Sequence, residues 1–376
     1  MRVAIVGASG FVGTRLVERW TLTGAHEVIA VARNATSLAR LARFGVPRWE
    51  QADALDLPAL TAAIRGCDAL VHVMVGDPQQ IVNAAEVAWQ ACRDAGVARL
   101  VYTSSASVFG QNPPPGTDDH TVPHDHHAVE YNNAKVRAER ALAQAEGVEV
   151  AILRPGIVYG PRSQWFTTLP RDLEGGAAML VGGGTGVCNH IYVDNLVHAI
   201  EIALTHPSAC SQPFYVADED ALAWRDFYRP AVERLGYDLA DMAAVAPVGA
   251  SRGRRRGAAA LMPVMKAGAR IVSPRIVPAR ARDAMRAALD VLTSPPRASS
   301  FALPHPEPPA PSIELSELHT CATRLPMHDA TTILGYTPPV PTATALARTA
   351  EWLAEAWPSD QEAARAAAPL DQGADG

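Results

Sequence analysis

The sequence predicts an α/β fold in which a doubly wound parallel sheet is covered by helices on both faces. Apolar runs and helical stretches alternate through the first 160 residues, and a glycine-rich turn follows the first apolar run. Strands that alternate with helices at this spacing form βαβ units, and such units build a parallel sheet. The 376 residues, 48% of them hydrophobic, are enough for one large domain or two coupled domains.

The expected elements follow one another in a regular order. The run "RVAIVG" precedes a helix near Phe11, and "EVIAVAR" precedes a helix near Ser37. A third strand ends shortly before Asp53, "DALVHVMV" leads into the helical stretch "QQIVNAAEVAWQACRDAG", and "RLVYTSS" leads toward a helix around Tyr131. The run "EVAILRP" closes the series, after which the alternation loosens and Pro and Gly become dense at 294–312.

The composition argues against several classes of protein. A net charge of -6 disfavours nucleic-acid binding, which requires an excess of Lys and Arg, and we interpret the basic cluster "SRGRRRG" at 251–257 as a solvated loop. Five cysteines without a C-x-x-C pair indicate reduced thiols in a cytoplasmic protein, and no signal peptide is evident. The most apolar late stretch, 258–277, is interrupted by charges and prolines, so we expect no membrane-spanning segment.

A glycine pattern follows the first strand, where "GASGFVG" places Gly7, Gly10 and Gly13. Glycine lets the backbone turn tightly and approach a pyrophosphate, which then lies at a helix N-terminus where free N–H groups favour an anion. The pattern therefore predicts a dinucleotide-binding domain of the Rossmann type, which we assign to residues 1–160. We expect residues 161–358 to form a smaller, mixed substrate-binding region interleaved with the sheet, with a helical insertion at about 250–295, and 359–376 to form a flexible tail.

The end of the second strand indicates which dinucleotide is bound. An acidic residue there hydrogen-bonds the 2′-hydroxyl of NAD, whereas an arginine accommodates the 2′-phosphate of NADP. The sequence has Ala32 and Arg33 at this place, which favours NADP(H) over NAD(H). Asp53, after the third strand, is placed to meet the adenine edge, although capping the following turn explains it equally well.

Tyr131 and Lys135 stand four positions apart on one predicted helix, so both side chains can point into one common space. An unperturbed phenol has a pKa of about 10 and is a poor base at neutral pH. A neighbouring ammonium, together with a positively charged nicotinamide, stabilises the phenolate and brings its pKa closer to working pH. The pair is therefore a candidate for proton transfer, but the same spacing occurs by chance in many helices, and the rest of the chain must decide between the two interpretations.

Four ordered motifs, "GASGFVG", "VYTSSASVFG", "YNNAK" and "LRPGIVYGP", resemble the extended short-chain dehydrogenase/reductase superfamily and its NAD(P)-dependent epimerase/dehydratase group. The resemblance implies a catalytic triad of Ser105, Tyr131 and Lys135, in which Ser105 hydrogen-bonds the substrate oxygen and Lys135 also holds the nicotinamide ribose. It implies a homodimer as well, built through a helix pair. The complete set of predicted cofactor-binding residues is Gly7, Ser9, Gly10, Phe11, Val12, Gly13, Arg33, Asp53, Ala54, Val73, Met74, Tyr131, Lys135, Pro155 and Ile157.

Departures from the group's pattern bear on the substrate. The chain has "HVMV" after the fourth strand, where Met74 and Val75 add bulk near the pyrophosphate or the substrate. Sugar-nucleotide enzymes often carry an arginine just before the "YVD" segment, and this chain has "VCNHIYVDN" instead. The wording of its later segments is closer to the 3β-hydroxysteroid dehydrogenase and dihydroflavonol reductase-like branches, which act on apolar alcohols and ketones.

Three hypotheses for function remain open. The first is an NADP(H)-dependent oxidoreductase that interconverts a ketone or aldehyde with an alcohol on a mainly apolar small molecule. The second is an epimerase or dehydratase of a nucleotide sugar. The third is a regulatory protein that binds NADP without chemistry, although a complete Ser105, Tyr131 and Lys135 set argues against it.

Two further groups of residues need an interpretation. The segment "HTVPHDHHAVEY" concentrates four histidines and Asp125, but the chemistry needs no metal, and we expect this loop to line the substrate entrance with no metal bound. Five aromatic residues in the second half are available to line an apolar pocket, with a core position as the alternative for each: Trp165, Phe166, Tyr192, Trp224 and Phe227.

Overall fold

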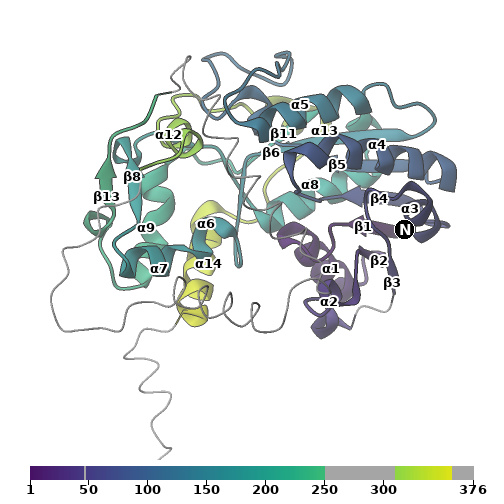
Figure 1. Ribbon diagram of the computed structural model, residues 1–376, viewed down its shortest axis with the longest axis horizontal. Coiled ribbons are helices and arrows are strands. Elements are labelled where there is room, and N and C mark those ends of the chain that lie inside the picture. The colour runs from purple at the N-terminus through teal and green to yellow at the C-terminus, as the bar shows by residue number, and fades with distance from the viewer. Residues whose placement is uncertain (46–47, 250–309, 358–376) are drawn as a thin grey trace, which may run out of the picture. The chain divides into compact units, whose positions relative to one another are not determined.

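Seven strands form one parallel sheet in the order β11-β6-β5-β4-β1-β2-β3 (Figure 1). The computed structural model describes residues 1–45, 48–249 and 310–357. The strands are β1 (Arg2–Val6), β2 (Glu27–Ala32), β3 (Trp49–Gln51), β4 (Ala69–His72), β5 (Arg99–Thr103), β6 (Glu149–Pro155) and β11 (Phe214–Val216). The chain runs outward from β1 to β3 and then returns to β4 on the other side of β1. In such sheets the ligand site lies at this switch point, beyond the carboxyl ends of the strands.

Helices cover both faces of the sheet because the strands are apolar on both sides. Val3 and Ile5 of β1 pack into a core with α1 (Phe11–Thr23) and α8 (Val193–Thr205). Ala4 and Val6 pack on the opposite face with α3 (Leu57–Ala63), α4 (Pro78–Ala95) and α5 (Glu130–Leu142). This arrangement confirms the predicted doubly wound α/β fold of the Rossmann type.

The second half of the chain adds short elements beside this sheet. Its helices are α6 (Gln164–Thr167), α7 (Leu169–Glu174), α9 (Trp224–Arg234), α12 (Ile313–His319), α13 (His328–Leu334) and α14 (Thr342–Ala356). Its strands pair as β7 (Ile157–Tyr159) with β10 (His190–Tyr192), β8 (Met179–Val181) with β13 (Ala243–Val245), and β9 (Val187–Cys188) with β12 (Leu222–Ala223). The 3₁₀ helices are η1 (Ala42–Phe44), η2 (Ala106–Phe109), η3 (Gly182–Gly184), η4 (Pro207–Cys210) and η5 (Leu239–Asp241).

The two halves of the chain share one sheet. Strand β11 comes from the later region and pairs with β6, and α8 covers the face that α1 also covers. The described residues up to Val248 and from 310 onward therefore belong to a single unit. The expected insertion at 250–295, the basic cluster at 251–257 and the tail from 359 lie outside the described residues.

Local contacts correct the expected bounds of two elements. The helix expected near Ser37 is α2 (Ala35–Leu38), which begins earlier because the Asn34 side chain accepts from the Ser37 N–H at 2.9 Å and caps the helix. The strand in "EVIAVAR" ends at Ala32, so Arg33 lies in the turn that follows. Within the described residues no helix is long and apolar enough to span a membrane, and all five cysteines are free thiols.

Four of the five aromatic residues that were candidates for the pocket occupy the core positions that were their alternative. Phe166, Tyr192, Trp224 and Phe227 are at most 3% exposed and pack into a core with α9 and α14. Phe227 contacts Phe166 and Trp224 at ring-centroid distances of 5.1 and 5.6 Å. Aromatic pairs at such distances are favourable packing contacts, so the core alternative holds for these four. Only Trp165 borders the large cavity described below.

Candidate active site

The turn between β1 and α1 requires glycine at two positions. Gly7 has a φ of 88°, and a Cβ there would lie 2.9 Å from the backbone nitrogen of Met74. A Cβ on Gly13 would lie 2.1 Å from the Gly7 carbonyl oxygen, so α1 can approach β1 only with glycine at this position. No side chain caps the N-terminus of α1, and its first turn holds no acidic residue. The turn therefore fits a bound diphosphate, because free N–H groups and the helix dipole favour an anion.

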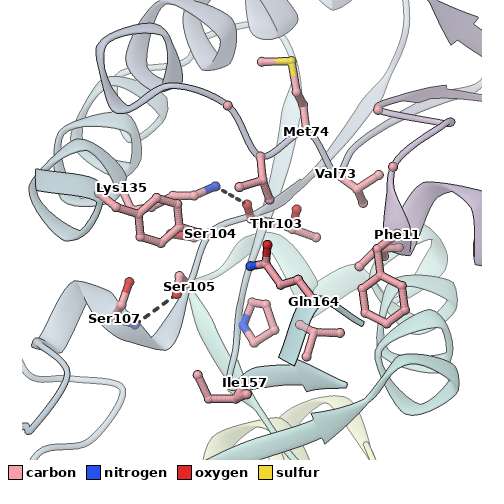
Figure 2. A pocket seen from close by; sticks show the side chains of 18 of the residues that line it. Phe11, Val73, Met74, Thr103, Ser104, Ser105, Ser107, Lys135, Ile157 and Gln164 are labelled. Atoms are coloured by element: carbon pink, nitrogen blue, oxygen red, sulfur yellow. Dashed lines mark hydrogen bonds between the residues drawn. The ribbon is translucent and has the colours of Figure 1, made fainter. Parts of the chain in front are cut away.

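A cavity of about 920 Å³ extends from this turn across the carboxyl ends of the central strands. Its size lies at the upper end of the ~300–1,000 Å³ typical of ligand sites. In Figure 2, Phe11 lies on one side of the pocket, and Ser105, Ser107 and Lys135 lie on the other. The structure brings together these predicted site residues on the cavity wall: Gly7, Ser9, Gly10, Phe11, Val12, Arg33, Ala54, Val73, Met74, Ser105, Tyr131, Lys135, Pro155 and Ile157.

Two of the predicted cofactor-binding residues do not line this cavity. Gly13 instead allows α1 to pack closely against the end of β1, because it has no side chain. Asp53 is exposed, and its Oδ1 accepts from the Leu55 N–H at 3.0 Å, which is the contact of a turn-capping aspartate. Its neighbours Ala52 and Ala54 line the cavity instead of Asp53.

Arginines gather at the end of the cavity near β2. Arg33 lines the cavity, and Arg162, on the loop after β7, lines it as well. Arg162 has a φ of 73° and is the single non-glycine residue with positive φ in the described chain. Burial, followed by the charges of Arg43 and Arg40, lowers the pKa of Arg162, against an opposing effect of Glu18. A local excess of positive charge of this kind suits a phosphate ligand.

The predicted catalytic residues come from β5 and α5. Ser105 follows β5, and its Oγ accepts from the Ser107 N–H at 3.1 Å, which fixes the hydroxyl at the start of η2. Tyr131 and Lys135 lie one turn apart on α5. Lys135 is 1% exposed, and its Nζ donates to the Thr103 carbonyl at 2.8 Å (Figure 2) and to the Tyr102 hydroxyl at 3.4 Å. The Lys135 ammonium lies 5.9 Å from the centre of the Tyr131 ring.

Burial controls the protonation of both residues. It lowers the pKa of the Lys135 ammonium to about 8 and raises the pKa of the Tyr131 phenol to about 12. The Ser105 hydroxyl opposes the shift of the phenol, and the charge of Glu314 adds to it. Without a bound nicotinamide, Tyr131 is therefore a protonated acid at neutral pH. The lowering of the Tyr131 pKa that the sequence predicts therefore requires a positively charged cofactor.

The catalytic end of the cavity is mainly apolar, with a few polar groups. The Gln111 amide, next to the 3₁₀ turn after Ser105, donates to Glu314 Oε1 at 3.0 Å and to Asn132 Oδ1 at 3.4 Å. The remaining wall beside them includes Pro113, Trp165, Val187, Asn189, Leu318, Cys321 and Leu325. Among the described residues that line the cavity, the cations are Arg33, Lys135 and Arg162. Of these three, Lys135 alone lies on α5 beside Tyr131.

Sequence reasoning did not find several of these residues. Arg162 directly follows the "LRPGIVYGP" motif, and this position was a usable signal. Gln111 and Glu314 meet across a separation of 203 residues, and Glu314 follows a Pro-rich segment that reads as a connector. No local pattern indicates such a contact.

The histidine loop before α5 does not line the cavity, contrary to the expectation that it borders the substrate entrance. The His127 ring contacts the Val108 carbonyl at 3.0 Å and stacks on His124 with ring centroids 4.2 Å apart. His120 turns toward Asp329, with 3.2 Å between Nε2 and Oδ2. These contacts hold the loop against neighbouring elements, and the described residues contain no group of three or more side chains placed to hold a metal ion.

Comparison with known proteins gives a family and a range of activities. A profile of the NAD dependent epimerase/dehydratase family matches residues 3–217. UDP-glucose 4-epimerase of Vibrio cholerae is 33% identical over 235 residues, which are 57% of this chain and 70% of that protein. The 3 beta-hydroxysteroid dehydrogenase/Delta 5-->4-isomerase of Mycobacterium tuberculosis is 30% identical over 270 residues, 62% of this chain and 70% of that one.

A solved structure shares the fold over nearly the whole length. The dTDP-glucose 4,6-dehydratase of Streptomyces venezuelae, crystallised with NAD bound, superimposes with a TM-score of 0.66 and covers 94% of this chain and 97% of its own. Its sequence identity is 21%, so the likeness concerns the fold. The sequence relatives include both a sugar-nucleotide epimerase and a steroid dehydrogenase, and they do not by themselves select a substrate.

Proposed function

The chain belongs to the NAD dependent epimerase/dehydratase family of extended short-chain dehydrogenases/reductases and is an NAD(P)-dependent enzyme, and on this premise we propose an NADP(H)-dependent oxidoreductase. It interconverts a ketone or aldehyde with the matching alcohol on a mainly apolar small molecule. The observation that carries this proposal is the part of the cavity wall that comes from the later region of the chain, where the apolar side chains of Trp165, Val187, Leu318 and Leu325 stand with one amide, Asn189, and one carboxylate, Glu314. Arg162, from the same region, lies toward α1 and η1, so none of these six described residues offers a guanidinium to the diphosphate of a sugar nucleotide.

The cofactor would be held by the β1–α1 turn and the ends of the neighbouring strands. Gly7, Gly10 and the N-terminus of α1 would bind the diphosphate, and Pro155 and Ile157 would lie against the nicotinamide. When bound, NADPH supplies the hydride for reduction. Arg33 and Arg162 support NADP over NAD, because both line the cavity and a 2′-phosphate offers them charge-assisted hydrogen bonds.

Three residues of this chain would handle the substrate oxygen. Ser105 is held at the start of η2 with its hydroxyl on the cavity wall, so it can hydrogen-bond the carbonyl oxygen. Tyr131, protonated at neutral pH, can donate the proton that the new alcohol requires. Lys135 is fixed by the Thr103 carbonyl with its ammonium 5.9 Å from the centre of the Tyr131 ring, so its charge can stabilise the phenolate that remains after the proton has been given up.

The substrate-binding region is assigned to the later part of the chain, residues 161–358, as a functional and not a separate structural unit. Trp165, Asn189, Glu314 and Leu318 all line the catalytic end of the cavity and all come from this part. Exchange of residues 161–358 for those of a sugar-nucleotide relative should therefore change the substrate. Unchanged specificity in a folded chimera would contradict the assignment.

A nucleotide-sugar epimerase or dehydratase is the second candidate, and the 33% identity to the Vibrio cholerae UDP-glucose 4-epimerase favours it. The two candidates differ in cofactor turnover, because a reductase consumes NADPH and an epimerase regenerates its cofactor in each cycle. The test incubates the protein with NADPH and a panel of apolar ketones, aldehydes and nucleotide sugars while reduced-nicotinamide absorbance is followed. Steady loss with a ketone or aldehyde, absent in Tyr131→Phe, supports the oxidoreductase. NADPH binding without loss of absorbance, together with no conversion of any nucleotide sugar when NAD⁺ or NADP⁺ is supplied, would instead favour a regulatory protein.

The proposal also covers the oligomeric state of the protein and its location in the cell. The family resemblance supports a homodimer, and the five free thiols suit a reducing compartment such as the cytoplasm. Light scattering on the purified protein tests the first point, and a mass near that of one chain, 39.9 kDa, would contradict it.

A further inference from the structure

A hydrogen bond holds the carboxylate of Glu314 at the catalytic end of the cavity. Helix α12 is capped by Ser312, whose side chain accepts from the Leu315 N–H at 3.0 Å, and Glu314 lies in its first turn. The amide of Gln111 joins Glu314 to Asn132, the residue that follows Tyr131 on α5. Because Gln111 is itself 8% exposed and shared between the two acceptors, it fixes the Glu314 carboxylate close to the catalytic helix.

The other charged residues on the described cavity wall are Arg33, just after the end of β2, and Asp77, Lys135 and Arg162. Asp77 also lines the cavity, but its Oδ1 accepts from the Gln79 N–H and caps α4. Lys135 donates to the Thr103 carbonyl beneath the phenol. The charges of Arg40, Arg43 and Glu18 act on the pKa of Arg162, so Arg162 lies toward α1 and η1. Lys135 is 1% exposed, whereas Glu314 is exposed, so among the described residues Glu314 is the charged group beside Tyr131 that a substrate can contact directly.

A fixed negative charge at this place discriminates between substrates by their own charge. Two like charges repel by about 1.4 kcal/mol when they lie about 7 Å apart at an effective dielectric of about 35, a value between those of a protein surface and water, and this energy corresponds to about tenfold in binding. A neutral carbonyl compound avoids this repulsion, and a hydroxyl or ammonium group on it can donate to the carboxylate. The charge of Glu314 also reaches the phenol of Tyr131, whose pKa it raises.

We propose that Glu314 is a specificity-determining residue that admits uncharged or cationic carbonyl substrates and rejects anionic ones. This inference rests on the proposed oxidoreductase function and narrows its substrate class. It disfavours sugar nucleotides and free keto acids, and it favours neutral ketones or aldehydes, including those with a hydrogen-bond donor near the carbonyl.

The test uses two aryl ketones that differ in one charge, acetophenone-para-carboxylate and its methyl ester. Reduction of each by NADPH is measured with the wild type, with Glu314→Gln and with Glu317→Gln. The last is a matched control, because Glu317 lies one turn along the same helix and does not line the cavity. Equilibrium binding of both ketones to the NADP⁺-saturated protein, followed by tryptophan fluorescence through Trp165 on the cavity wall, provides a readout that does not need turnover.

We expect the wild type to prefer the ester over the carboxylate by about tenfold or more in kcat/KM, and Glu314→Gln to reduce that preference by about tenfold. Glu317→Gln should retain the wild-type preference. In Glu314→Gln the pH profile of the reaction should also move to lower pH, because a charge that raises the pKa of Tyr131 is removed. If Glu314 had no contact with the site, its replacement would change neither the ester preference nor the pH profile.

The outcomes separate this inference from the proposed function. An ester preference that is the same in the wild type and Glu314→Gln would overturn the inference while leaving the reductase intact. If neither ketone is reduced but binding shows the expected charge preference and its loss in Glu314→Gln, the selection by Glu314 stands and the reductase proposal fails. Tighter binding of the carboxylate than of the ester, or binding of neither, would overturn the inference.

Discussion

Replacing Ala32 with Asp and Arg33 with Ala is expected to reverse the cofactor preference of the protein. Ala32 is the last residue of β2 and Arg33 the first residue of the turn, and both line the cavity. A guanidinium at this place can pair with a 2′-phosphate, whereas a carboxylate repels that phosphate and accepts from the free hydroxyl of NAD. The double variant therefore removes one attraction and adds one repulsion.

The size of the effect follows from the exposure of Arg33. A hydrogen bond to a charged group contributes about 1.5–3 kcal/mol, but an exposed pair is screened by solvent and contributes much less. Because Arg33 is exposed, we expect a combined change of about 2 kcal/mol, or about 30-fold in the ratio of the two dissociation constants. The wild-type preference for NADPH should weaken as salt is raised, since exposed charges are screened over about 8–10 Å at physiological ionic strength.

Calorimetric titration of NADPH and NADH against the wild type and the double variant measures this change. Arg48→Ala serves as the matched control, because Arg48 is also exposed but pairs with Glu50 and does not line the cavity. Equal affinities in the wild type, or tighter binding of NADH, would show that Arg33 does not meet a 2′-phosphate and would refute the assignment of NADP.

Three further substitutions test separate parts of the account. Tyr131→Phe should lower kcat by about 10²–10⁴ with cofactor affinity nearly unchanged, and a kcat above about a tenth of the wild-type value would remove the phenol from the proton-transfer step. Gly13→Ala should destabilise the protein by about 1–3 kcal/mol, because the added Cβ would lie 2.1 Å from the Gly7 carbonyl oxygen, and an unchanged Tm would show that α1 can shift freely. Burial depresses the pKa of Lys135 to about 8 in the folded state, below the ~10.4 of an unfolded lysine, so the unfolded state binds the extra proton between these values. The stability of the wild type should therefore rise with pH across this window relative to Lys135→Met, by about 3 kcal/mol, and parallel pH dependences of the stabilities of the two proteins would contradict the shift.

Local patterns in the sequence were sufficient for the parts of the site that lie on single elements. The strand, glycine turn and helix at the N-terminus predict the cradle around Gly7, because each step depends on neighbouring residues. The spacing of Tyr131 and Lys135 likewise places both on one face of α5. The parallel sheet follows from the alternation of strands and helices, which is repeated often enough to be read directly.

The sequence was insufficient where tertiary packing decides the outcome. Phe166 and Trp165 are adjacent and both contact α9, through Phe227 and Trp224, yet Phe166 is fully buried in the core while the partly buried Trp165 also borders the cavity. The sequence allows Asp53 either to meet the adenine or to cap the following turn. In the structure its carboxylate accepts from the Leu55 N–H and caps the turn. The contact between Gln111 and Glu314 joins distant segments, and its effect on Tyr131 depends on a distance that no sequence spacing encodes.

Under the proposed function, the protein transfers hydride from NADPH to a neutral carbonyl compound and releases the alcohol. Two parallel reactions separate the candidates: one supplies the methyl ester of acetophenone-para-carboxylate with NADPH deuterated at the transferred position, and the other supplies UDP-glucose with NAD⁺ or NADP⁺. Mass spectrometry of the products should find one deuterium in the alcohol for each NADPH consumed, and unchanged UDP-glucose. An isomer or dehydrated product of UDP-glucose, formed without net reduction of the oxidised cofactor and without reduction of the ketone in the first reaction, would show that the protein is an epimerase or dehydratase instead.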